Sequence, residues 1–160
     1  MEKNSFQKIS IKMITDTANV NRGTFYLHFK DKNDLRDQCI EMHLNTILTM
    51  CTGNHSGAFT SKSAMTLTFE YLEKHYAFYQ VMLTGVDNAY FRKKMEEILH
   101  IGLSEYFENK KFKDNLDKKI ATQFIVCAGA GLIEWWLTNK NDYNVDYLVD
   151  QFWEIINSFR

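Results

Sequence analysis

Apolar positions with helical spacing recur along the whole chain and are separated by short polar segments. Near the N-terminus, Ile11, Ile14 and Ala18 lie three and four residues apart and would share one buried face of a helix. Ser10 precedes them as a good N-cap. Asn19 follows where the chain must turn, because asparagine tolerates the left-handed conformation. We therefore predict a first short helix between Ser10 and Asn19.

A second short helix is predicted directly after this turn, from about Arg22 to Phe29. Asn21 is placed to cap it, and Phe25 and Phe29 lie four residues apart on its inner face. A cation, a hydroxyl, a phenol and an imidazole remain on its outer side: Arg22, Thr24, Tyr26 and His28. Two short helices joined in this way predict a helix-turn-helix, whose second helix can enter the DNA major groove. The alternative is an ordinary helical hairpin within a bundle.

The remainder of the chain predicts a body of long helices. A connecting helix from Asn33 to about Cys51 begins at Asp31-x-x-Asp34, a weak capping-box variant, and a loop follows over residues 52–57. Further helices are predicted over residues 61–75, 77–84, a segment capped by Asp87 that ends near Asn109, 116–139 and 143–159. No proline interrupts them. The pattern predicts an all-α fold, with a helix-turn-helix over residues 1–36 and a C-terminal helical regulatory and dimerisation domain over residues 37–160.

The last two helices are the predicted surface for self-association. Gly129 and Gly131 lie inside a helix, where each glycine costs roughly 1 kcal/mol relative to alanine, so close approach by another helix would explain them. The final helix carries one wide apolar stripe: Val145, Leu148, Val149, Phe152, Ile155, Ile156 and Phe159. Two such helices from each of two chains would form a four-helix interface, which predicts a homodimer through residues 116–159. The alternative is that these faces pack internally within a monomer.

A pocket for a small-molecule effector is predicted among the middle helices, because methionine and aromatic side chains line adaptable apolar cavities well. Its candidate walls are Tyr71, His75, Phe78, Tyr79, Met82, Tyr90, Met95, Leu99, Leu103, Phe124 and Trp135. His100 and Glu134 are further polar possibilities. The same side chains could simply fill the core, and their types do not identify a ligand.

The charge distribution favours contact with DNA at the N-terminal end only. The chain as a whole has a net charge of −1. Residues 1–36 contain seven Lys/Arg and four Asp/Glu, a net charge of +3, whereas the rest contains twelve Lys/Arg and sixteen Asp/Glu, a net charge of −4. A positive end on an acidic body is expected of a module that meets nucleic acid at one end.

The remaining chemistry-bearing residues predict neither an enzyme nor a metal or cofactor site. Cys39, Cys51 and Cys127 form no CxxC pair and are expected to be buried small apolar residues in a reducing compartment. The histidines lack paired ligand spacing, and the motifs of serine hydrolases, P-loop proteins, dinucleotide enzymes and zinc proteases are missing. Without a secretory signal or an apolar run of about 18 residues, no membrane span is expected, and the predicted location is the cytoplasm.

Residues 10–14 are Ser-Ile-Lys-Met-Ile, and residues 18–35 are Ala-Asn-Val-Asn-Arg-Gly-Thr-Phe-Tyr-Leu-His-Phe-Lys-Asp-Lys-Asn-Asp-Leu. The segment from Phe6 to Leu35 resembles the DNA-binding signature of the TetR/AcrR family of bacterial regulators, and Gly-Thr-Phe-Tyr-x-His-Phe is its most specific part. The resemblance implies an all-helical dimer with a C-terminal ligand-binding or interaction domain. The chain differs from the usual family pattern in two respects. A complete helix usually precedes the motif, and here we expect a shortened form or a member that dispenses with that helix. Asn19 stands where glycine is usual.

The resemblance also implies roles for individual residues. The side chains placed against bases or nearby backbone are Lys12, Arg22, Gly23, Thr24 and Tyr26, and those placed against phosphates are Ser10, His28, Lys30 and Lys32, with Asn21 between the two helices. Arginine can make a bidentate contact to guanine, whereas a lysine at a helix end mostly neutralises backbone charge.

The expected function is that of a TetR-like regulator, a repressor that binds a palindromic double-stranded operator under the control of a small molecule or partner. Ligand binding would pivot the connecting helix and change the spacing of two recognition helices, which must stay near one DNA turn, about 34–36 Å. The alternative is a helical dimeric interaction protein that has lost DNA binding.

Overall fold

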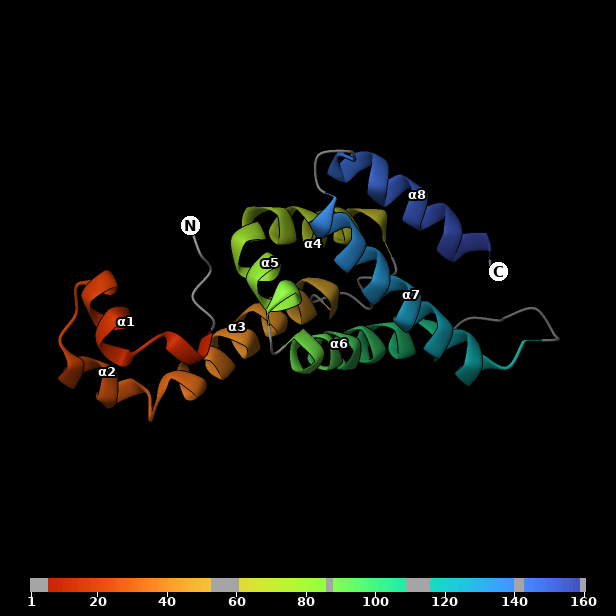
Figure 1. Cartoon of the computed structure of the whole chain (residues 1–160). Helices are drawn as coiled ribbons and strands as arrows, with labels where there is room; N and C mark the ends of the chain where they lie inside the picture. Colours follow the sequence, from red (N-terminus) through yellow and green to blue (C-terminus); the bar gives the residue numbers. More distant parts are fainter. Residues whose placement is uncertain (1–5, 53–60, 86–87, 109–115, 140–142, 159–160) are drawn as a thin grey trace. The chain divides into compact units, whose positions relative to one another are not determined.

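The computed structural model describes residues 6–52, 61–85, 88–108, 116–139 and 143–158. Over these ranges the chain forms one 3₁₀ helix and eight α-helices and no strand, which confirms the predicted all-α fold (Figure 1). The predicted loop beyond Thr52 and the predicted cap Asp87 lie outside the described residues.

The chain divides into two compact units, residues 1–43 and residues 44–160. The sequence predicts a boundary after residue 36. The division falls instead inside α3 (Lys32–Thr52), which is one continuous helix. The two units are described separately below.

The first unit contains η1 (Phe6–Lys8), α1 (Ile11–Ala18), α2 (Arg22–His28) and the start of α3. The Oγ atom of Ser10 accepts a hydrogen bond from the Met13 backbone N–H at 3.2 Å. Asn19 ends α1 in the left-handed conformation, with φ 51°. The Oδ1 atom of Asn21 accepts from the Gly23 N–H at 2.8 Å and starts α2. The three predicted caps are thereby confirmed, and they set both ends of the turn.

The core of the first unit is centred on Phe25, which is 4% exposed and lies 5.4 Å from the Phe29 ring between centroids. The most buried residue of α1 is Thr15, whose hydroxyl donates to the Lys12 carbonyl at 3.1 Å and so needs no water. Ala18 is exposed. Its predicted place on the inner face was wrong, because α1 ends one turn after Thr15 and Ala18 extends past the core.

The second unit contains the C-terminal part of α3 and five further helices: α4 (Lys62–Lys74), α5 (Tyr76–Thr84), α6 (Asn88–Glu108), α7 (Lys118–Thr138) and α8 (Val145–Ser158). Within this unit α6 packs along α7, α4 packs against α8, and α5 contacts both α6 and α7 (Figure 1). The predicted break between α4 and α5 is at His75.

Aromatic rings join the helices of the second unit. Trp136 is fully buried, and its ring meets that of Phe69 edge to face at 5.4 Å, while Phe69 meets Phe152 at 6.3 Å. The indole Nε1–H donates to the Tyr143 carbonyl at 3.1 Å. Because burying one large apolar side chain contributes about 1.5–3 kcal/mol, this cluster holds α4, α7 and α8 together.

The apolar stripe of α8 serves this internal packing. Five of its members are buried inside the chain: Val145, Leu148, Val149, Phe152 and Ile156. A Cβ atom added to Gly129 would meet the Phe152 ring at 3.5 Å, so the close approach that this glycine allows is also within the chain. These five residues of the stripe therefore pack within their own chain, as the alternative to self-association expected. Ile155 is its exposed member, and Phe159 lies outside the described residues.

By length and composition alone, α7 is apolar enough to cross a membrane. Half of that apolar window is buried inside the unit. Packing against α5 and α6 accounts for this half, and an exposed face accounts for the rest.

Candidate DNA-binding surface

The outer side of α2 carries the polar side chains that the sequence predicted there. Arg22, Thr24 and His28 are exposed, and Tyr26 is 51% exposed. The Tyr26 ring meets the buried Phe25 ring edge to face, with 5.5 Å between centroids. The exposed phenol is thus supported directly by the core, as a helix that reads a DNA groove requires.

Leu27 is a residue of this surface that the sequence reasoning missed. It is 81% exposed, the most exposed of the large apolar side chains of the described chain. At 100° per residue it lies between the Arg22/Tyr26 side and the Thr24/His28 side of α2 and almost opposite Phe25. Its spacing from Phe25 could have placed it outside. A leucine there suits the methyl group of thymine, the apolar feature of the major groove.

Lys32 has a different role from the predicted one. Its ammonium donates to the backbone carbonyls of Phe6, Gln7 and Ile9 at 3.0, 3.0 and 2.9 Å. It also lies 5.0 Å from the centre of the Phe6 ring. A lysine ammonium has three N–H donors, so no donor remains for a phosphate. This geometry contradicts the predicted phosphate contact, and we name the arrangement the Lys32 clamp.

Two carboxylates order the turn between α2 and α3. Asp31 Oδ1 accepts from the backbone N–H groups of Asn33 and Asp34 at 2.7 and 3.0 Å, and so caps α3. Asp34 Oδ2 accepts from the Lys30 N–H at 2.7 Å. The hydrogen bond from Lys30, and then that from Gln38, lowers the pKa of Asp34 below its usual value. The predicted capping box is present, but Asp34 reaches one residue further back than usual.

Three of the cations predicted to contact DNA are exposed: Lys12, Arg22 and Lys30. None of them forms an ion pair within the described part of the chain. Ser10 and Asn21 are exposed and cap helices, and Gly23 carries no side chain that would separate α2 from a base. As DNA contacts, all these positions remain predictions.

The residues of the predicted ligand pocket differ in their burial. Tyr79, Met95, Leu99 and Leu103 are buried core residues, and Tyr71, His75, Phe78 and Met82 are half-buried. Burial raises the pKa of the Tyr79 phenol, with a smaller contribution from Tyr71. The remaining three members are exposed: Tyr90 by 39%, Phe124 by 59% and Trp135 by 43%. They are not walls of an enclosed cavity, although Phe124 lines an open groove between α6 and α7 together with His100.

The cysteine prediction also needs correction. Cys127 is exposed, and Cys39 is half-buried. The side chain of Cys51 lies outside the described residues. Cys127 belongs to the outer side of α7, opposite the residues that pack on α6.

Two family models together match most of the chain. Residues 1–39 match the model of bacterial regulatory proteins of the TetR family, and residues 60–158 match a transcriptional regulator C-terminal region. The chain belongs to the TetR family. This TetR-family protein is a DNA-binding transcriptional regulator, and its family is non-enzymatic, as the sequence predicted.

Relatives and solved structures agree with this family. The TetR-family chain is 22% identical to the fatty acid metabolism regulator protein of Bacillus subtilis (strain 168), over 98% of this chain and 87% of that protein. A TetR transcriptional regulator from Streptococcus agalactiae 2603V is 19% identical, with a TM-score of 0.72 over 96% of this chain and 85% of that one. The fatty acid degradation regulator FadR of Bacillus halodurans is 18% identical, with a TM-score of 0.65 over 96% and 86%.

Proposed function

We propose that this TetR-family regulator binds a palindromic operator as a homodimer and represses transcription there. The observation that carries the proposal is the outer side of α2, where Arg22, Tyr26 and Leu27 are exposed above the buried Phe25. Arginine can bind guanine through two hydrogen bonds, and leucine can contact a thymine methyl group. Lys12 and Lys30 supply charge for phosphates on either side, which would fix the register of α2 on the duplex.

An exposed apolar surface supports the dimer. We name it the α7–α8 face; its members are the exposed Ile120, Phe124, Cys127, Trp135, Tyr147 and Ile155 and the half-buried Gly131. The five on α7 are spaced four, three, four and four residues apart and so follow one line. A Cβ atom added to Gly131 would meet nothing within 4 Å, which leaves room for another helix. Contiguous exposed apolar surface marks an interface, and a helix-turn-helix protein needs a second copy to bind two half-sites.

Control of DNA binding by a small molecule or partner in the second unit completes the proposal. The continuous α3 is the covalent connection through which such a signal would reach the first unit. Because the B. subtilis relative is named a regulator of fatty acid metabolism, genes of acyl-chain metabolism are the first targets to test. As a repressor that binds chromosomal DNA, the protein would act in the cytoplasm.

Fluorescence anisotropy with the DNA upstream of the protein's own gene tests the proposal. We expect tight, salt-dependent binding to that DNA and at least 1,000-fold weaker binding to a shuffled duplex, as is typical of specific sites. A reporter placed behind that DNA should be less active when the regulator is present. Equal binding to both duplexes would contradict the proposal and favour a protein that acts only through its interaction surface.

A further inference from the structure

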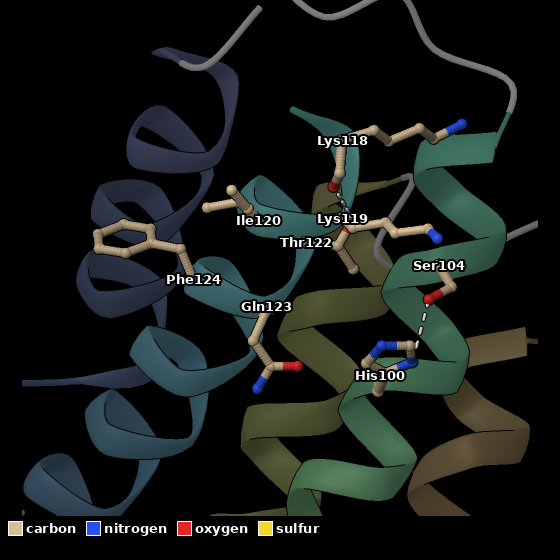
Figure 2. A pocket seen from close by; sticks show the side chains of 8 residues that line it. All are labelled: His100, Ser104, Lys118, Lys119, Ile120, Thr122, Gln123 and Phe124. Carbon is tan, nitrogen blue, oxygen red and sulfur yellow. Dashed lines mark hydrogen bonds between the residues drawn. The ribbon is translucent and has the colours of Figure 1, made fainter. Parts of the chain in front are cut away.

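An open groove in the second unit is lined by the C-terminal half of α6 and by the first two turns of α7, and it extends across the outer surface of α7 (Figure 2). Its volume is about 720 Å³, which is within the size range of small-molecule sites. His100 and Ser104 line it from α6 and are joined by a 3.1 Å hydrogen bond between Nδ1 and Oγ. Lys118 and Lys119 line it from α7.

The described residues that line this groove include two cations and no acidic side chain. Lys118 and Lys119 are exposed, and neither forms an ion pair in the residues that the structure describes. Asp117 is engaged as the cap of α7, where its Oδ1 accepts from the N–H groups of Lys119 and Ile120 at 2.9 and 3.0 Å. A helix carries partial positive charge at this end, so two lysines in its first turn are electrostatically unfavourable, and the single Asp117 carboxylate offsets only part of this positive charge. A bound anion would remove that cost through the side chains, since Asp117 already occupies the backbone N–H groups.

The other edge of the groove is apolar. Ile120 is 70% exposed and Phe124 is 59% exposed. In Figure 2 both side chains project from α7 on the side away from His100 and Ser104, and Gln123 lies between the two edges. A ligand that lies along the groove across α7 would therefore contact the two lysines at one end and Ile120 and Phe124 at the other.

We propose that this groove binds a small organic anion with an apolar part. The charged group lies against Lys118, Lys119 and the His100–Ser104 pair, and the hydrocarbon covers Ile120 and Phe124. These two residues also belong to the α7–α8 face, so the hydrocarbon would lie at the rim of the proposed dimer. That relation rests on the proposed function. The cationic edge does not, because Lys118 and Lys119 are more than 90° around α7 from the middle of the face, at about 100° per residue.

Isothermal titration of the full chain with three probes tests the proposal: decanoate, 1-decanol and inorganic phosphate. We expect decanoate to bind and phosphate to bind at least ten-fold more weakly, because phosphate lacks the apolar part. The double variant Lys118→Gln/Lys119→Gln should bind decanoate about ten-fold more weakly, since each exposed ion pair contributes modestly. Its binding of decanol should be unchanged. Lys93→Gln, which removes an exposed α6 lysine outside the groove, should bind decanoate like the natural chain.

Three results would overturn the proposal. The double variant could bind decanoate as the natural chain does, which would place the anion elsewhere. Lys93→Gln could lose as much affinity for decanoate as the double variant, which would show that the loss comes from the net charge of the chain and not from the groove. Phosphate could bind as tightly as decanoate, which would remove the apolar half of the site. Sedimentation velocity and DNA anisotropy without any probe report on the proposed dimer and operator binding, so a failure of those would be distinguishable.

Discussion

The Lys32 ammonium donates to the Ile9 carbonyl at 2.9 Å and so joins two residues that are 23 positions apart. Its bonds to Phe6 and Gln7 converge on the same nitrogen. Because Ser10 starts α1 directly after Ile9, the Lys32 clamp sets where the helix-turn-helix begins relative to α3. The clamp therefore acts on DNA binding through the position of α1.

Lys32→Met should destabilise the first unit. Hydrogen bonds to a charged group contribute about 1.5–3 kcal/mol, and methionine keeps the side-chain length without any donor. We expect earlier thermal unfolding, faster hydrogen exchange over residues 6–14 and weaker DNA binding. The slope of log affinity against log salt concentration should stay unchanged, because Lys32 neutralises no phosphate.

Lys30→Gln is the matched control for the clamp. Its side chain is exposed and forms no ion pair in the described ranges, so thermal unfolding should not change. If Lys30 contacts a phosphate, the salt slope should fall by about 1. The opposite pattern, with the lower slope in Lys32→Met, would show that Lys32 leaves the carbonyls and holds phosphate in the complex.

Leu27→Ala should weaken operator binding by about 1–2 kcal/mol without affecting stability, because the side chain is 81% exposed. A duplex in which deoxyuridine replaces thymidine, one position at a time, lacks the methyl group that Leu27 would contact. At one position the substitution should weaken binding of the natural chain and leave binding of Leu27→Ala unchanged, as a double-mutant cycle requires. Additive losses at every position would exclude the contact. Tyr26→Phe, which keeps the ring, should show no such coupling to the thymine methyl.

Asp34→Asn should lower the free energy of unfolding at neutral pH. This difference from the natural chain should become smaller in acid. The pKa of Asp34 in the folded chain lies below its ordinary value of 3.8, mainly because the Lys30 N–H donates to the carboxylate. A lowered pKa contributes stability above the unfolded value, and that stability is lost as the pH falls through the folded pKa. Urea unfolding at pH 7, 5 and 3 measures the difference between the two chains. A difference that is constant over this range would contradict an ionised Asp34 in the turn.

Cys127 reports directly on the proposed dimer. It lies on the α7–α8 face, and in a two-fold interface a residue near the axis meets its own copy. In a Cys39→Ser/Cys51→Ser chain, a short bismaleimide should cross-link two copies through Cys127. Adding Trp135→Glu should abolish the cross-link, since a carboxylate would be buried at the interface. Val81→Glu, which changes an exposed residue of α5, should leave it intact. A monomer in sedimentation velocity at micromolar concentration would contradict the dimer.

Local signals were sufficient for the helices and their ends. Ser10, Asn19 and Asn21 act within four residues of themselves, so the sequence alone located α1, the turn and α2. The outer position of Thr24 followed from the spacing of Phe25 and Phe29, whereas those of Arg22 and Tyr26 followed from their polar character. The same spacing predicts an outer position for Leu27, whereas its hydrophobicity predicts a place in the core.

The partners of long side chains and the choice between faces depended on tertiary structure. From its place in the sequence, Lys32 was predicted to contact a phosphate. Only the tertiary structure, in which residues 6–9 lie against the start of α3, brings three backbone carbonyls to its ammonium. By sequence, the apolar stripe of α8 could pack against another copy or within its own chain. The contact between Phe152 and Phe69 shows that it packs within its own chain. Phe124 and Trp135 were predicted as cavity walls, yet both are exposed, and Phe124 lines an open groove and not an enclosed cavity. Helical spacing shows which residues share a face but not what that face contacts.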